Sequence, residues 1–184
     1  MTTIFGLSGS LRRGSFNAGL LRAAAELAPA SAAIKVGSIR DVPLYNADEE
    51  AAHGIPQAVQ ALKASLRAAD GLLLVTPEYN NGIPGVFKNA IDWMSRPASD
   101  IAGLFGGKPV AILGASPGGF GTVLSQNDWL PVLRTLGTRH WFAGRLLVAH
   151  AGSLFDQEGD LIDEGIRERL RAFIAGFVDF IEGR

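Results

Sequence analysis

The chain has 184 residues, of which 47% are hydrophobic, and a formal net charge of −1. This length predicts a single domain spanning residues 1–184. The chain has no basic or acidic block, so nothing in its charge pattern indicates binding to nucleic acid or to a membrane surface. The absence of cysteine excludes disulfides, thiolate metal sites and a cysteine nucleophile, and three scattered histidines predict no metal site. With neither a signal-peptide pattern nor an apolar run near roughly 18 residues, we expect a cytoplasmic protein.

Strand and helix patterns alternate five times along the chain, without repeats or a linker. Short unbroken apolar runs such as 71–76 are typical of strands buried on both faces of a parallel sheet. Alternation of this kind predicts an α/β protein with helices on both faces of the sheet. For five strands we expect the flavodoxin-like order 2-1-3-4-5. The expected strands are 3–8, 33–39, 71–76, 108–114 and 146–149, and the expected helices are 17–28, 56–69, 86–94, 122–136 (kinked or divided at Pro131) and 164–182, with 96–107 as a surface loop.

The loop after the first strand has the composition of a phosphate site. It contains Ser10, Arg12, Ser15 and Asn17 and leads directly into a helix. A helix N-terminus presents free backbone N–H groups to an anion, and Arg12 adds a forked positive charge. The alternative is a helix that is simply capped by serine. The segment lacks the Lys-Ser/Thr of a nucleotide-triphosphate loop and the dinucleotide fingerprint, which favours a monophosphate.

The loop at 77–85 follows the third strand and is unusually long for a strand-to-helix connection. Its prolines fix the backbone and its glycines permit close approach, so it is suited to the edge of a flat heteroaromatic ring. Tyr79 is expected to pack on such a ring and Asn80 to hydrogen-bond to it. Glu78 is a candidate base or metal ligand, or else a surface or subunit contact. The Gly-rich loop 115–121 would close the other side, and a monophosphate plus a flat ring describes FMN.

Two segments together, 9–17 and 77–93, closely resemble the NADPH-dependent FMN reductase family, which includes quinone, chromate and azo reductases. The resemblance covers essentially the whole chain. It implies a flavodoxin-like fold, non-covalent FMN, NADPH or NADH as donor, and a homodimer or homotetramer. It also implies ping-pong hydride transfer through FMN to quinones, flavins, azo compounds or chromate, without a catalytic side chain. Carried over by position, the phosphate contacts would be Ser10, Arg12, Ser15, Phe16 and Asn17, and the ring contacts Pro77, Glu78, Tyr79 and Asn80, with Ser116 and Gly119 on the far side.

Two other functional classes fit parts of the sequence. A flavodoxin-like electron carrier or an FMN-binding sensor would share the cofactor site without NAD(P)H turnover. A serine hydrolase would use Ser116, because residues 114–118 match G-x-S-x-G and are followed by Asp128 and by histidines. Pro117 argues against the hydrolase, since it removes the backbone N–H expected in the oxyanion hole.

Overall fold

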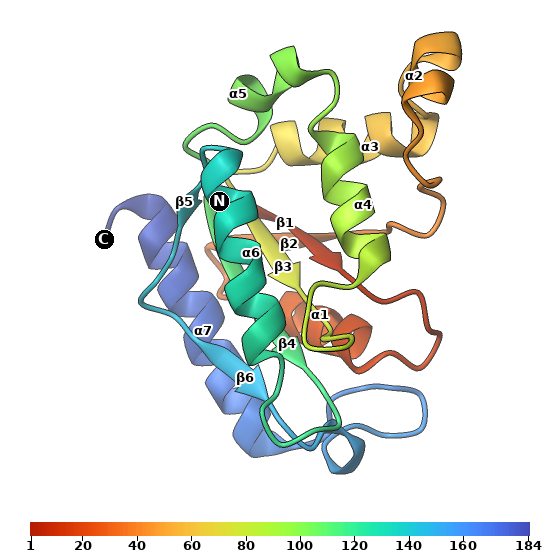
Figure 1. The fold of residues 1–184 in the computed structure, drawn as a ribbon. Coiled ribbons are helices and arrows are strands. Elements are labelled where there is room, and N and C mark those ends of the chain that lie inside the picture. Colours follow the sequence, from red (N-terminus) through yellow and green to blue (C-terminus); the bar gives the residue numbers. More distant parts are fainter.

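The computed structural model describes residues 1–184 and has a parallel sheet at its centre (Figure 1). The sheet order is β2-β1-β3-β4, and both β5 and β6 pair with the outer edge of β4. This arrangement confirms the predicted order 2-1-3-4-5. The strands are β1 (Thr2–Ser8), β2 (Ala32–Gly37), β3 (Gly71–Val75), β4 (Pro109–Ala115), β5 (Arg139–His140) and β6 (Leu146–Val148).

The fifth position of the sheet is filled by two short strands where the sequence predicted one. β5 pairs with Pro109 and Val110 at the start of β4, and β6 pairs with residues 113–115 at its end. Between them the backbone N–H of Trp141 still donates to the carbonyl of Val110 in β4 at 2.8 Å, and its ring packs against Phe173 and Phe177, with centroids 5.0 and 5.8 Å away. β5 escaped prediction because Arg139-His140 carries no apolar run, whereas pairing to β4 requires only backbone groups.

Helices cover both faces of the sheet, as predicted. The core on one face is formed with α1 and α7, and the core on the other with α3, α4, α5 and α6. α6 runs without a break through Pro131. No helix is both long and apolar enough to cross a membrane. The helices are α1 (Phe16–Glu26), α2 (Ala47–His53), α3 (Gln57–Arg67), α4 (Gly85–Met94), α5 (Ile101–Leu104), α6 (Val123–Thr135) and α7 (Glu164–Glu182), with short 3-10 turns at Ala98–Asp100 and Ala151–Ser153.

The segment 96–107 is not the surface loop that the sequence suggested. It folds into a 3-10 turn and α5, and it places Leu104 and Phe105 in the core. These two apolar side chains are too few for a periodic pattern, yet they anchor the segment to the core while most of its other residues stay exposed. The helix α2, also unpredicted, buries no residue and is attached by Glu50, whose carboxylate binds Arg96 Nε at 2.9 Å. That hydrogen bond lowers the pKa of Glu50.

Candidate cofactor site at the carboxyl edge of the sheet

A cavity of about 470 Å³ lies where β1, β3 and β4 end. In Figure 1 the loops that follow these three strands lie together at the lower right of the sheet. Ligands of open α/β sheets bind at this edge, next to the point where the strand order reverses. The cavity is lined by Ser10, Arg12, Ser15, Phe16, Asn17, Pro77, Glu78, Tyr79, Ala115, Ser116, Pro117 and Gly152. Most of the residues proposed from the sequence are therefore neighbours; Asn80 and Gly119 lie outside the lining.

The first loop presents free donors at the start of α1. Ser15 is the helix cap, and its Oγ accepts a hydrogen bond from the N–H of Ala18 at 3.3 Å. The backbone N–H groups of Ser15, Phe16 and Asn17 have no partner within the protein. The guanidinium of Arg12 lies 5.0 Å from the centroid of the Phe16 ring, at the same end of the helix. Free N–H groups, the helix dipole and a cation together make an anion site.

The side chain of Asn17 is fully engaged with another loop. Its Nδ2 donates to the carbonyl of Ala115 at 2.8 Å, and its Oδ1 accepts from the N–H of Ala115 at 2.9 Å. The residue is buried. Asn17 thus clamps the start of α1 to the end of β4, which leaves its backbone N–H as the group that faces an anion.

Tight packing of the Phe87 and Pro77 side chains against the backbone of the first loop explains the glycine at position 9. A Cβ on Gly9 would lie 2.3 Å from Phe87 Cδ1 and 2.9 Å from Pro77 Cδ. No side chain fits at these distances, so only glycine lets the two loops share one wall of the cavity.

The second loop begins with a tight hairpin that displays Tyr79. Tyr79 and Gly82 exchange two backbone hydrogen bonds of 3.1 Å, and the intervening Asn80 and Asn81 have φ angles of 50° and 64°. Asparagine tolerates this left-handed conformation better than most residues and is common in two-residue hairpins. The Tyr79 side chain is 51% exposed, so it is available to a ligand.

Glu78 is a helix cap supplied from a neighbouring loop. Its Oε2 accepts hydrogen bonds from the N–H groups of Leu124 and Ser125, at 2.8 and 3.0 Å. These are first-turn groups of α6, where a carboxylate is favoured by the helix dipole. The roles of base and metal ligand considered for Glu78 find no support in this geometry, and the described residues contain no acidic or histidine cluster able to hold a metal.

The third loop is held in shape by Ser116. Its hydroxyl donates to the carbonyl of Gly121, and its N–H donates to Val148 at 3.0 Å. No hydrogen bond joins Ser116 to a histidine, as a hydrolase nucleophile would require. Gly119 lies beyond the cavity, where an added Cβ would be 3.5 Å from His150 Cε1.

A buried polar network supports the second and third loops from behind. The Thr76 hydroxyl donates to the carbonyl of Pro77, contacts Ser125 Oγ at 2.8 Å and accepts from Trp129 Nε1 at 3.2 Å. All of these side chains are buried. The network joins the end of β3 to α6, and no local sequence pattern indicates it.

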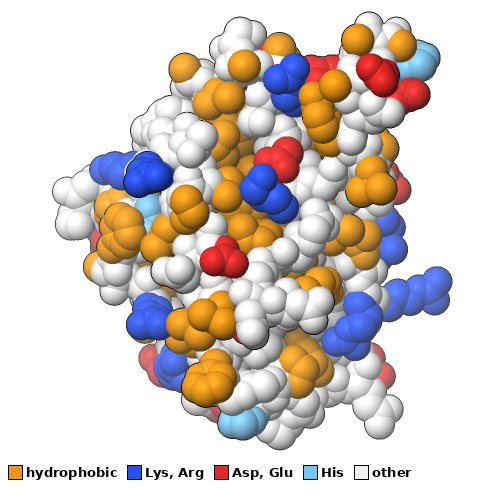
Figure 2. All heavy atoms as spheres, viewed as in Figure 1, with side chains coloured by type: hydrophobic (Ala, Val, Ile, Leu, Met, Phe, Trp, Pro, Cys, Tyr) orange, Lys and Arg blue, Asp and Glu red, His pale blue; other side chains and the backbone are white.

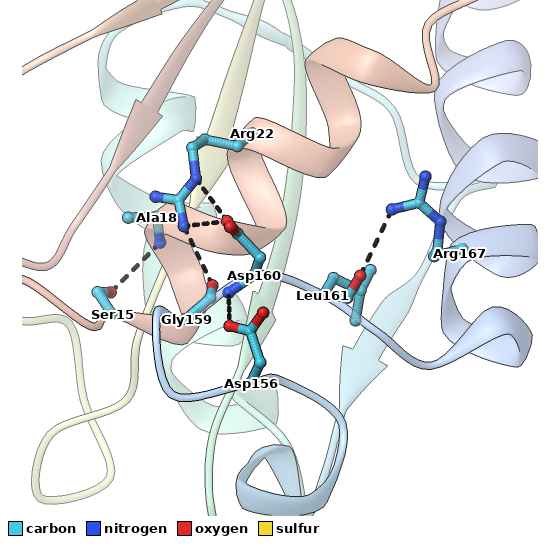
Figure 3. Close-up of polar contacts among 8 residues, drawn as sticks. All are labelled: Ser15, Ala18, Arg22, Asp156, Gly159, Asp160, Leu161 and Arg167. Carbon is cyan, nitrogen blue, oxygen red and sulfur yellow. Dashed lines mark hydrogen bonds and ion pairs between the residues drawn. The ribbon is translucent and has the colours of Figure 1, made fainter.

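The turn at 156–160 supports α1 from the outside (Figure 3). Arg22 Nε donates to Asp160 Oδ1 at 2.9 Å, and its Nη2 donates to the carbonyl of Gly159 at 3.2 Å. The backbones approach so closely that a Cβ on Gly19 would lie 1.7 Å from the Gly159 oxygen. The helix that begins at the anion site is therefore fixed from two sides, by Asn17 and by this turn.

The sheet order, the anion site after β1 and the ligand loops after β3 and β4 define a flavodoxin-like protein. The sequence model of the family described as NADPH-dependent FMN reductase matches residues 2–153. The chain therefore belongs to this family.

Three relatives illustrate the similarity. The chain is 43% identical to an NAD(P)H-dependent FMN reductase of Pseudomonas aeruginosa, over 91% of this chain and 89% of that one. It is 38% identical to a 2-hydroxy-1,4-benzoquinone reductase of a Burkholderia species, over 96% and 94%. A solved structure of a flavoenzyme NAD(P)H:(acceptor) oxidoreductase from Paracoccus denitrificans superposes with a TM-score of 0.87 and 34% identity, covering 100% of this chain and 98% of that one.

Proposed function

We propose that this protein is an NAD(P)H-dependent oxidoreductase that uses bound FMN to reduce quinones and other small electron acceptors. The observation that carries the proposal is the single cavity in which the donors of the first loop meet the second and third loops. Membership of the FMN reductase family and the likeness to reductases of quinones support the same activity.

The residues at the start of α1 suit the FMN phosphate. Backbone N–H groups of Ser15, Phe16 and Asn17 are unpaired, and the hydroxyl protons of Ser10 and Ser15 have no acceptor within the protein. Arg12 supplies a charge that can bind phosphate oxygens in a forked geometry. The one carboxylate of the lining, Glu78, is turned to the N-terminus of α6 and offers its oxygen there.

The second and third loops suit the isoalloxazine. We assign Pro77, Glu78, Tyr79 and Asn80 to one side of the ring and Ser116 and Gly119 to the other. Tyr79 supplies an exposed aromatic face, while Glu78 and Ser116 act by fixing the loops. Asn80 and Gly119 belong to these loops but not to the cavity lining, so we propose them as contacts at the outer edge of the ring.

When bound, FMN would supply the redox chemistry, as the carrier of reducing equivalents from NAD(P)H to the acceptor. The chain binds and orients the reactants, and no acid or base is needed among its side chains. We propose that donor and acceptor use the same open side of the cavity in turn, in a ping-pong order.

We also propose that the chain is one domain that assembles as a homodimer or homotetramer. Large apolar side chains are exposed around the ligand loops and the edge strands, including Phe120 at 82% and Phe142 at 76%. Such exposed groups near a site mark interaction surfaces when they gather. Light scattering of the purified protein at several concentrations tests the assembly, and a strictly monomeric mass contradicts it.

The first experiment is an absorbance spectrum of the purified protein, before and after anaerobic addition of NADPH. Flavin bands that bleach within seconds, and return when a quinone is added, are the expected result. Bands that persist would indicate an electron carrier or a sensor without NAD(P)H turnover. A colourless protein that also fails to take up added FMN would overturn the proposal and return attention to Ser116.

A further inference from the structure

A second cavity, of about 260 Å³, lies on the other side of the β1–α1 loop, between α1 and the segment that follows β2. It shares Ser10 and Arg12 with the proposed FMN cavity, so the two are direct neighbours. Lys and Arg side chains gather at the right edge in Figure 2, where this loop projects in Figure 1. The role proposed for FMN does not account for this second cavity.

Four arginines line the second cavity, and no carboxylate does. They are Arg12, Arg13, Arg22 and Arg40. Arg22 is paired with Asp160 (Figure 3). Arg40 Nη2 donates to the carbonyl of Leu11 at 2.9 Å, and Arg13 forms no hydrogen bond or ion pair in the protein. The charges of Arg12, Arg13 and Arg40 are therefore not neutralised by any acidic side chain, although the chain as a whole carries −1.

Three serine hydroxyls add neutral donors to the same cavity. The Oγ of Ser8 is buried without a hydrogen-bond partner. The Oγ atoms of Ser10 and Ser38 accept hydrogen bonds from the N–H groups of Arg12 and Arg40, at 3.4 and 3.3 Å, and neither donates one within the protein. Guanidinium groups and hydroxyl donors without a competing carboxylate are the chemistry that recognises a phosphate monoester.

The FMN phosphate is already matched by the unpaired N–H groups at the start of α1, which belong to the first cavity. A second phosphate monoester is carried by NADPH, on the ribose 2′ oxygen, and is absent from NADH. We propose that Arg13 and Arg40, together with Ser8 and Ser38, bind the 2′-phosphate of NADPH in this arginine pocket and make NADPH the preferred donor. Arg12 and Ser10 lie at the boundary of the two cavities and remain with the FMN phosphate. The proposal rests on the proposed function and names the residues that choose the donor.

The test uses the FMN-loaded protein and calorimetric titration with 2′,5′-ADP and with 5′-AMP, which lacks the 2′-phosphate. We expect 2′,5′-ADP to bind at least about tenfold more tightly, as one charge-assisted contact would give. Arg13→Ala removes a side chain with no partner in the protein, and it should abolish most of this difference. The same variant should raise KM for NADPH about tenfold while KM for NADH and kcat remain unchanged. Arg13→Lys, which keeps the charge, should restore part of the affinity.

Arg145→Ala is the matched control, because it removes one exposed, unpaired arginine outside both cavities. It should change neither titration. Equal affinities for 2′,5′-ADP and 5′-AMP would show that the pocket does not recognise the 2′-phosphate, and so would an equal rise of the KM for NADPH and the KM for NADH in Arg13→Ala. If NADPH still bleaches the flavin in that case, the proposed function stands and only the inference fails. If 2′,5′-ADP binds only to FMN-free protein and FMN displaces it, Arg13 and Arg40 also serve the FMN phosphate and the inference is wrong. A protein that binds no FMN would instead overturn the proposed function.

Discussion

The side-chain amide of Asn17 forms two hydrogen bonds with the backbone of Ala115, a residue 98 positions away in the chain. This buried pair connects the anion site at the start of α1 to the loop proposed to hold the far side of the ring. Asn17→Ala would leave both backbone groups of Ala115 without their partner. We expect the free energy of unfolding to fall by roughly 1–3 kcal/mol and FMN affinity to fall about tenfold, or about 1.4 kcal/mol.

The control for this prediction is Asn89→Ala. Asn89 also bonds two backbone groups, the carbonyl of Pro43 and the N–H of Tyr45, but outside the cavity. The Asn89→Ala variant should have a lower free energy of unfolding, measured by denaturant unfolding, and an unchanged FMN affinity, measured by fluorescence titration. Equal FMN affinities in the two variants would show that the Asn17 clamp does not shape the site.

Tyr79→Ala tests the exposed face of the second loop. The side chain is half exposed and its backbone already forms the hairpin, so unfolding free energy should change by no more than about 0.5 kcal/mol. Loss of an aromatic contact should weaken FMN or quinone binding roughly two- to tenfold. Tyr79→Phe keeps the ring and should behave like the parent. Unchanged FMN affinity and turnover in Tyr79→Ala would remove the role that we give this residue.

Glu78→Gln separates a positioning role from an acid–base role. The glutamine oxygen can still accept from the N–H groups of Leu124 and Ser125, but the favourable charge at the helix N-terminus is lost. We expect a loss of up to about 1 kcal/mol in unfolding free energy and an unchanged pH profile of kcat. Glu158→Gln, at an exposed glutamate without a partner, is the control. A basic or acidic limb that disappears only in Glu78→Gln would restore Glu78 as a proton carrier.

Gly19→Ala tests the support that the 156–160 turn gives to α1. The new Cβ would lie 1.7 Å from the carbonyl oxygen of Gly159, a backbone atom that cannot rotate away. We expect the free energy of unfolding to fall by roughly 1–3 kcal/mol, because the two segments are forced apart. FMN binding should also weaken, because Ser15 moves with the helix. Gly103→Ala, where nothing lies within 4 Å, should be neutral or slightly stabilising. A fully stable Gly19→Ala would contradict the tight contact.

The fold was predictable because each central strand is an unbroken apolar run and each helix has a distinct apolar face. The first and second loops stood out for a different reason. Several hydroxyl, amide and arginine side chains follow the first strand, and the 77–85 connection is longer than a plain strand-to-helix connection needs, which favours a ligand. Local patterns failed at β5, whose pairing depends only on the backbone, and at 96–107, where only Leu104 and Phe105 anchor the segment to the core.

The partners of individual side chains could not be predicted, because they come from elements distant in sequence. Glu78 caps α6 from 46 and 47 residues away, and Thr76 bonds Ser125 across 49. The composition of the 77–85 loop indicates a ligand but not that its carboxylate is already engaged. The sequence therefore indicated loops that the structure brings together around one cavity. Which of their side chains are engaged in supporting contacts could be read only from the structure.

His140 lies beside α6 at the outer edge of the sheet. Its Nδ1 is buried without a partner, and burial lowers the pKa of its ring below the usual 6.5. The unfolded chain therefore binds a proton more readily than the folded protein, and the unfolding free energy should fall as the pH drops below about 6.5. His140→Phe removes the proton site and keeps an aromatic ring against Phe142, 4.5 Å away between centroids. Urea unfolding of parent and variant is compared first at pH 8, which gives the reference stability of each protein. Between pH 8 and pH 5 the free energy of unfolding should fall less in the variant than in the parent. An identical pH slope in the two proteins would show that His140 contributes nothing to acid sensitivity.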